Sequence, residues 1–220
     1  IVDRNIDKRV ERTKLRPIAS GKITIIRSLV YVILLCLLSL IILIQFNNLT
    51  IFLGVASMIL AFSYPYMKRI TYWPQLFLGL TFNWGIIMAW TSIMNDISLE
   101  IMLLYLSAIF WTLGYDTIYG LQDIKDDEII GMKSTSIKFK NNIKLFVSMC
   151  YLINLSILIY IFKNFLGGNY TTILLIVYIL SLIMQIYIFN KKNPQSCLEA
   201  FRLNNFSGLM LFIFIFFLPQ

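Results

Sequence analysis

The sequence contains no histidine among its 220 residues. That absence excludes Ser-His-Asp hydrolysis, a His–Cys nucleophile pair, haem with a histidine axial ligand, and any zinc site built on imidazole. Cysteine is also scarce, since the chain has only three, without CxxC spacing. Cys36 and Cys150 lie in or at the end of apolar runs, and Cys197 lies in a polar stretch. We therefore interpret the cysteines as packing residues and not as a metal or disulfide set.

Charged residues are scarce as well, at 14% of the chain against the roughly 25% that is usual in soluble domains. Crossing a hydrocarbon core takes about 20 apolar residues. Uncharged stretches of about that length or longer recur at 28–67, 70–95, 145–162, 164–190 and 203–220. The composition therefore predicts an integral membrane protein with a single transmembrane domain over 1–220, and it excludes a water-soluble enzyme.

The apolar runs are long and continuous, which favours helices over the short alternating strands of a membrane barrel. Polar residues at 45–48 interrupt the first run near its middle, where a turn between two spans is expected. The fold class predicted is therefore all-α, a polytopic bundle of about seven spans. We expect them near 24–45, 49–66, 74–94, 101–122, 143–162, 171–189 and 204–219.

The basic residues follow the same odd–even order as the spans. Of the 19 Lys and Arg residues, only Lys163 lies outside four alternate polar segments and their immediate flanks. Lys and Arg accumulate on the cytoplasmic or matrix side of membrane proteins. We expect that side to carry loops at about 1–23, 67–73, 123–142 and 190–203. This predicts either a bacterial inner membrane with the active site facing the cytoplasm, or a mitochondrial inner membrane with the site facing the matrix.

Two groups of carboxylates fall on that basic side. Asp3 and Asp7 are four residues apart, so on a helix they lie about one turn apart on one face. Asp116, Tyr119, Asp123 and Asp127 recur at helical intervals and predict one continuous helical stripe. Asp116 is expected within the depth of the membrane, where carboxylates are rare and usually functional.

Aspartate pairs beside basic residues suit a metal–phosphate site. Mg²⁺ prefers oxygen ligands and is typically held by one or two carboxylates together with substrate phosphates. Arg12, Lys14 and Arg16 follow Asp7, and Lys133 follows the second group. An EF-hand does not fit the order of residues after Asp123, and a solvated acidic loop is the alternative for that segment.

An apolar helical bundle with a metal–phosphate site indicates a lipid diphosphate as substrate. Ionisation of an allylic diphosphate would leave a carbocation, which a dry, aromatic pocket stabilises. The candidate aromatic residues for that pocket are Tyr64, Tyr66, Phe82, Trp84, Trp111, Tyr115 and Tyr119.

With these two groups of aspartates, the chain resembles the UbiA superfamily of intramembrane prenyltransferases, which has two aspartate motifs. The first is carried by Asp3-x3-Asp7-x2-Val10-x-Arg12-Thr13-x2-Arg16-Pro17-x2-Ser20-Gly21. The second is carried by Asp116-x2-Tyr119-x3-Asp123-x2-Asp126-Asp127-x3-Gly131-x-Lys133-Ser134-Thr135. The 4-hydroxybenzoate polyprenyltransferase branch is resembled at Tyr64-Pro65-x-Met67-Lys68-Arg69, at Pro74-Gln75, and at Phe201-Arg202-Leu203-Asn204-Asn205-x2-Gly208.

The resemblance implies nine helices around a central cavity and Mg²⁺-dependent transfer of a polyprenyl group from polyprenyl diphosphate to 4-hydroxybenzoate, in ubiquinone biosynthesis. It implies no nucleic-acid partner, only the two substrates and the lipid bilayer. The roles carried over are Mg²⁺ binding for Asp3, Asp7, Asp123 and Asp127, diphosphate binding for Arg12, Arg16 and Lys133, contact with the substrate's carboxylate for Arg69, and a catalytic role for Asp116 and Tyr119.

The chain begins Ile1-Val2-Asp3-Arg4, without an initiator Met or a signal peptide. The family's first motif opens with Asn-Asp just before the position of Ile1. We therefore expect these two residues, and about one and a half spans, to precede the printed chain in the natural protein.

Two other functions remain open from the residues alone. The first is a reaction of the same family with a different acceptor, either another ring or a lipid alcohol. From a different class, a cation-coupled transporter would also use buried aspartates, but it would require polar positions that continue to the neutral face, and the outer halves of the predicted spans are almost wholly apolar.

Overall fold

A computed structural model describes residues 1–8, 13–168 and 170–218, and within them the chain is helical with no strand. Seven helical segments are long and apolar enough to cross a membrane, so the prediction of an all-α integral membrane protein is confirmed. The helices are α1 (Arg4–Asp7), α2 (Ile25–Leu43), α3 (Asn48–Ile70), α4 (Pro74–Phe82), α5 (Trp84–Met94), α6 (Leu99–Gly120), α7 (Ile124–Ile130), α8 (Thr135–Lys138), α9 (Ile143–Phe162), α10 (Tyr170–Ile188), α11 (Pro194–Arg202) and α12 (Asn204–Phe216).

The last span differs from the prediction because it begins ten residues earlier than 204. α11 and α12 follow each other directly and together form a segment over Pro194–Phe216. Asn193 caps α11 by accepting hydrogen bonds from the backbone N–H groups of Gln195 and Ser196. The polar residues of α11 favoured a loop in the prediction. In the structure they lie on a helix whose buried face carries Cys197 and Ala200.

The third span is broken at Asn83, between α4 and α5. The Asn83 amide nitrogen donates to the carbonyls of Gly79 and Ala108 and to the Thr112 hydroxyl, at 2.9, 3.3 and 2.8 Å. Inside a membrane, backbone groups freed by a helix break need partners from the protein. Asn83 therefore fixes the break against α6.

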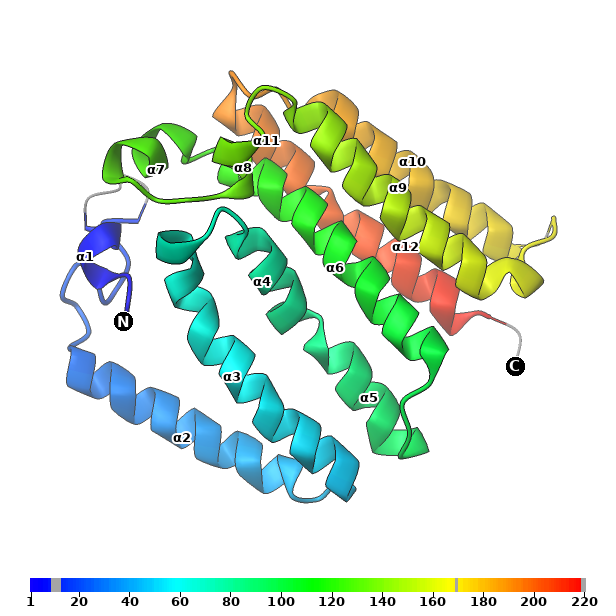
Figure 1. Ribbon diagram of the computed structural model, residues 1–220, viewed down its shortest axis with the longest axis horizontal. Coiled ribbons are helices and arrows are strands. Elements are labelled where there is room, and N and C mark those ends of the chain that lie inside the picture. The colour runs from blue at the N-terminus through cyan, green and yellow to red at the C-terminus, as the bar shows by residue number, and fades with distance from the viewer. Residues whose placement is uncertain (9–12, 169, 219–220) are drawn as a thin grey trace.

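The helices form one curved array in which α2, α3, α4–α5 and α6 follow in order, and α9, α10 and α12 pack beyond α6 (Figure 1). The main core lies around α6, α9, α10 and α12, where Leu158, Tyr178 and Phe214 have no exposed surface. Polar side chains cross this core as well. The Tyr178 hydroxyl donates to Asn154 at 2.9 Å, and the Asn154 amide donates to the Ser107 hydroxyl at 2.8 Å.

The short helices α1, α7, α8 and α11 gather at one end of this array, together with the C-terminal end of α3 (Figure 1). The predicted acidic and basic site residues are on these elements or beside them. One end of the bundle therefore holds the candidate site.

Candidate active site

The first aspartate pair lies on a single helical turn. The Asp7 backbone N–H donates to the Asp3 carbonyl at 2.8 Å, so the two carboxylates are one turn apart, as their spacing indicates. The Thr13 hydroxyl donates to the Asp7 carbonyl at 2.9 Å and holds the chain that follows against this turn. The pair is therefore presented from a short, internally bonded segment.

Each aspartate of this pair has an arginine partner. Arg69 Nη2 lies 3.2 Å from an Asp3 carboxylate oxygen and 3.1 Å from the Val2 carbonyl oxygen. Arg16 Nη1 lies 3.0 Å from an Asp7 carboxylate oxygen. The Asp3–Arg69 ion pair joins α1 to the last turn of α3, and so brings together the first aspartate motif and the arginine predicted to contact the acceptor.

A cavity of about 650 Å³ opens beside this pair. Its wall combines charged side chains with a mostly apolar remainder. Asp3, Asp7, Arg4 and Arg16 supply charge, whereas the rest of the lining is Ile1, Val2, Pro17, Ile18, Ile23, Ser28, Tyr31, Val32 and Pro65. This wall suits a ligand with a charged end and an apolar body.

The second acidic group does not form the single helical stripe that the spacing predicted. α6 ends at Gly120, and α7 begins at Ile124 with Asp123 as its N-cap. The Ser136 hydroxyl donates to the Thr117 carbonyl at 2.7 Å, and the Leu121 N–H bonds instead to the carbonyl of Ile118. The packing of α8 thus takes the carbonyl that a continuing α6 would use.

Asp116 and Tyr119 consequently lie on α6, whereas Asp123 and Asp127 lie at the start and in the first turn of α7. The Asp127 backbone N–H donates to the Asp123 carbonyl at 2.8 Å, so this second pair is also about one turn apart. The structure therefore provides two short turns, each with an aspartate pair, at the same end of the bundle.

The segment after α7 is held by buried hydrogen bonds. The Thr135 N–H donates to the Gln75 side-chain oxygen at 3.0 Å, and the Thr135 and Thr117 hydroxyls are 2.6 Å apart. Gln75 and Thr135 are buried, as is Ser136. The Ser-Thr part of the second motif is therefore an anchor for α8. Gln75, which was expected only as part of a motif, provides the side chain that holds it.

Lys133 contacts the end of α3. Its backbone N–H donates to the Lys68 carbonyl at 2.8 Å, and its ammonium group donates to the Ile70 carbonyl at 3.1 Å. Ile70 is the last residue of α3, whose free carbonyls attract a cation. Lys133 thus joins the second aspartate motif to the segment that carries Arg69.

Asp116 faces α3 from within the bundle. It lies close enough to Lys68 and Tyr64 to interact with both electrostatically, and Tyr64 also interacts with Asp3. Asp3 and Asp116, which belong to different motifs, are thus linked through the last turns of α3.

Tyr119 belongs to a chain of aromatic rings. Its ring centroid is 4.5 Å from that of Phe201 on α11, and Tyr115 lies 5.9 Å from the same ring. Trp111 continues this series at 5.8 Å from Tyr115, and its indole N–H donates to Asn204 at 3.2 Å. Phe201 and Asn204 belong to the motif over 201–208 that resembles the 4-hydroxybenzoate branch, and no site role was predicted for either residue.

The predicted Mg²⁺ ligands do not form a cluster of three or more, and none of that size occurs elsewhere in the described parts of the chain. Two separate pairs nevertheless fit Mg²⁺, because one or two carboxylates with substrate phosphates and water suffice. Both carboxylates are also partly exposed, since 31% of the Asp3 side chain and 19% of the Asp7 side chain are accessible. Arg12 lies outside the described residues.

Comparison with known proteins identifies a close set of relatives. The model of the UbiA prenyltransferase family matches residues 1–215. The mitochondrial 4-hydroxybenzoate polyprenyltransferase of Bos taurus is 43% identical over 96% of the chain and 57% of its own length. That of Drosophila melanogaster is 41% identical over 96% of the chain and 54% of its own length. The 4-hydroxybenzoate octaprenyltransferase of Psychromonas ingrahamii is 39% identical over 97% of the chain and 75% of its own length.

The chain spans about half the length of the mitochondrial relatives. Among solved structures, the apo structure of a UbiA homolog from Aeropyrum pernix K1 matches with a TM-score of 0.82 and 20% identity, over 98% of this chain and 80% of that one. The fold is therefore shared with that protein, and the predicted resemblance to the UbiA superfamily is confirmed by the family match. The chain belongs to the UbiA prenyltransferase family.

Proposed function

We propose that the protein transfers a polyprenyl group from an allylic polyprenyl diphosphate to the ring of 4-hydroxybenzoate, with release of diphosphate, in ubiquinone biosynthesis. The observation that carries this proposal is the Asp3–Arg69 ion pair, because it joins an aspartate predicted to bind Mg²⁺ to an arginine suited to a carboxylate acceptor. Relatives at about 40% identity over 96% of the chain are named for this reaction.

The diphosphate end of the donor would lie between the two aspartate pairs. Asp3, Asp7, Asp123 and Asp127 would hold Mg²⁺, which when bound neutralises charge on the departing diphosphate. Arg12 and Arg16 would contact the phosphate oxygens with their forked guanidinium groups. Lys133 would contact them with its ammonium group. Because the first pair lines the cavity with apolar side chains, the prenyl chain would extend from it into the bundle.

The reaction breaks the bond between the allylic carbon and the diphosphate oxygen, and the electron pair leaves with the diphosphate. A new carbon–carbon bond then forms to the aromatic ring, and the ring loses a proton. Tyr119 would offer its ring face to the cation. Asp116 would accept the proton or orient the ring's hydroxyl, since it lies within the bundle near Tyr64.

Arg69 would bind the carboxylate of the acceptor. Its hydrogen bonds to Asp3 and Val2 both use the same terminal nitrogen, Nη2. Nη1 can donate to a carboxylate oxygen of the acceptor while the ion pair to Asp3 is kept. The same ion pair would hold the guanidinium in place before the acceptor arrives.

Arg69→Ala is expected to raise the KM for 4-hydroxybenzoate about tenfold to a hundredfold, because a hydrogen-bonded charge pair is lost. The KM for the prenyl donor is expected to change far less. Steady-state kinetics with each substrate varied in turn measure both values. Arg27→Ala, an exposed arginine at the start of α2, is the matched control. Equal increases for both substrates would contradict a contact with the acceptor.

The reaction itself is tested in membranes that contain the protein. These are supplied with a polyprenyl diphosphate and radiolabelled 4-hydroxybenzoate, with Mg²⁺ or with EDTA. We expect label in the lipid extract only with the metal. No transfer by inserted protein would contradict this acceptor, and the same assay with other aromatic or lipid-alcohol acceptors then tests the remaining family reactions. To find which side of the bilayer the site faces, the substrates are supplied to only one side of sealed proteoliposomes of known orientation. We expect the site on the cytoplasmic or matrix face.

A further inference from the structure

Two adjoining cavities lie where α9 begins and α10 ends, and the smaller one extends to the outer side of α7, next to the second aspartate pair. The larger has a volume of about 680 Å³ and the smaller one of about 400 Å³. They share Asn141 and Lys191, and none of their lining residues lines the cavity beside Asp3. The proposed prenyl transfer uses no residue of this double cavity.

The lining of the double cavity is strongly basic. Its single carboxylate, Glu128, already lies 2.6 Å from the Lys140 ammonium group. The larger cavity contains Lys144 and Lys191 and no acidic residue. The lysines that line one or both cavities are Lys125, Lys140, Lys144, Lys191 and Lys192. This excess of positive charge favours an anionic ligand.

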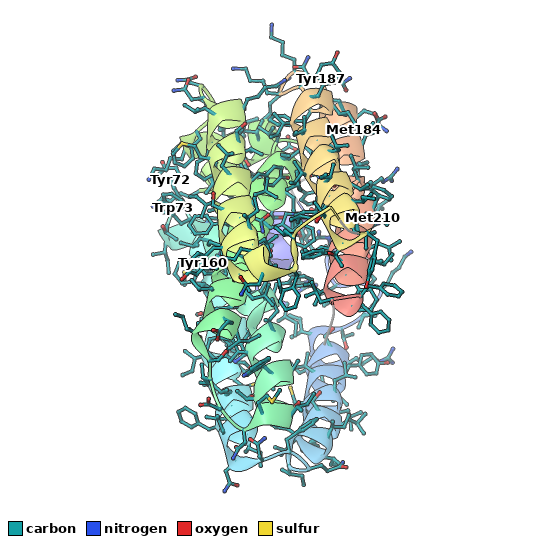
Figure 2. All side chains as sticks on the ribbon, turned by 90° about the vertical axis from the view of Figure 1, so that its right-hand side faces the viewer. Tyr72, Trp73, Tyr160, Met184, Tyr187 and Met210 are labelled. Carbon is teal, nitrogen blue, oxygen red and sulfur yellow. The ribbon has the colours of Figure 1, made fainter. Side chains whose placement is uncertain are left out.

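Large apolar side chains stand exposed beside the lysines. Tyr187 and Leu145, which line the larger cavity, are 85% and 62% exposed. Met184 lies one turn before Tyr187 on the same outward side of α10, where Figure 2 shows both, and it is 54% exposed. In a membrane protein such side chains face lipid, and lysines at the ends of spans reach the headgroups.

We propose that this double cavity binds the headgroup of an anionic phospholipid. The phosphate lies between Lys144 and Lys191, and an acyl chain runs along the apolar sides of α9 and α10 past Leu145 and Met184. Charge complementarity selects the anion, and the exposed apolar surface that continues from the cavity selects a lipid over a small soluble anion. Basic pockets between membrane helices are known to take such headgroups.

The test uses the purified protein in detergent, titrated with phosphatidylglycerol or phosphatidylcholine, with bound lipid counted by native mass spectrometry. We expect phosphatidylglycerol to bind more tightly than phosphatidylcholine. The double substitution Lys144→Gln and Lys191→Gln is expected to weaken its binding about thirty-fold, the ratio that corresponds to about 1 kcal/mol for each lysine. The single substitution Lys144→Gln is expected to weaken it about fivefold.

Two further double variants serve as controls. Lys22→Gln with Lys163→Gln removes the same charge from other exposed sites and should leave lipid binding unchanged. Lys144→Arg with Lys191→Arg keeps the charge and should retain binding. If the double glutamine variant is not monodisperse, the single variant and the arginine variant decide the result.

Three results would overturn the proposal. They are equal affinity for phosphatidylglycerol and phosphatidylcholine, equal weakening by the control pair of substitutions, or full displacement of the lipid by inorganic phosphate. The last would assign the double cavity to a soluble anion.

Discussion

Asp123→Asn is expected to lower prenyl transfer at least about a hundredfold, because the substitution removes the charge of a predicted Mg²⁺ ligand. The fold should be kept, since Asp123 is the N-cap of α7 and asparagine serves that position as well as aspartate does. The measurement is radiolabelled product formed per amount of inserted protein, over a range of Mg²⁺ concentrations. A raised requirement for Mg²⁺ in the residual activity would identify the metal as the lost partner.

The matched control for this variant is Asp126→Asn. Asp126 lies in the same first turn of α7 and carries the same charge, but it is not among the predicted ligands. Its substitution is expected to leave most of the activity. Similar losses in both variants would show that the turn needs negative charge in general, and would remove the specific assignment of Asp123.

Gly114→Ala is expected to destabilise the protein by about 1–3 kcal/mol, the usual cost of overpacking a filled core. Gly114 lies on α6 against the ring of Tyr151 on α9, and an added Cβ would overlap that ring. The ring cannot move aside easily, because Tyr151 is only 2% exposed and its hydroxyl is 2.5 Å from the Gln185 side-chain oxygen. Unfolding in detergent, followed by circular dichroism, gives the difference in stability.

Gly85→Ala provides the comparison. Gly85 is also helical, but an added Cβ would meet nothing within 4 Å. Since alanine is about 1 kcal/mol more favourable than glycine inside a helix, this variant should be neutral or slightly more stable. Equal unfolding midpoints for the two variants would contradict a close contact between α6 and α9.

The number and approximate positions of the spans could be predicted from sequence because the signal is local. A run of about 20 apolar residues is long enough to cross a bilayer whatever it later packs against. The beginning of the last span could not be found in this way, since α11 is amphipathic and its polar residues resemble a loop. The end of α6 was missed for a different reason. It depends on Ser136, which lies far along the chain from the Thr117 carbonyl that it occupies.

In the candidate site, too, the residue types could be predicted from local sequence, whereas the contacts between distant segments could not. The aspartates and basic residues of both motifs could be named from their types and spacing, and their Mg²⁺ and substrate roles stay predictions. The contact of Arg69 with Asp3 could not be inferred, because it joins segments 66 residues apart through the packing of α1 on α3. Likewise, the anchoring of α8 by Gln75 depends on how α4 and α6 lie side by side, which residue types do not reveal.

The helix break at Asn83 has a consequence for how the chain enters the membrane during synthesis. α4 has 9 residues and α5 has 11, so neither alone reaches across a hydrocarbon core. Two of the three groups that accept hydrogen bonds from Asn83 belong to α6, which is made later. Pro74–Met94 is long and apolar enough to enter the membrane as one segment. Its break at Asn83, however, gains these two partners only when α6 has been made, so we expect the final shape of this span to be fixed only after α6 is inserted.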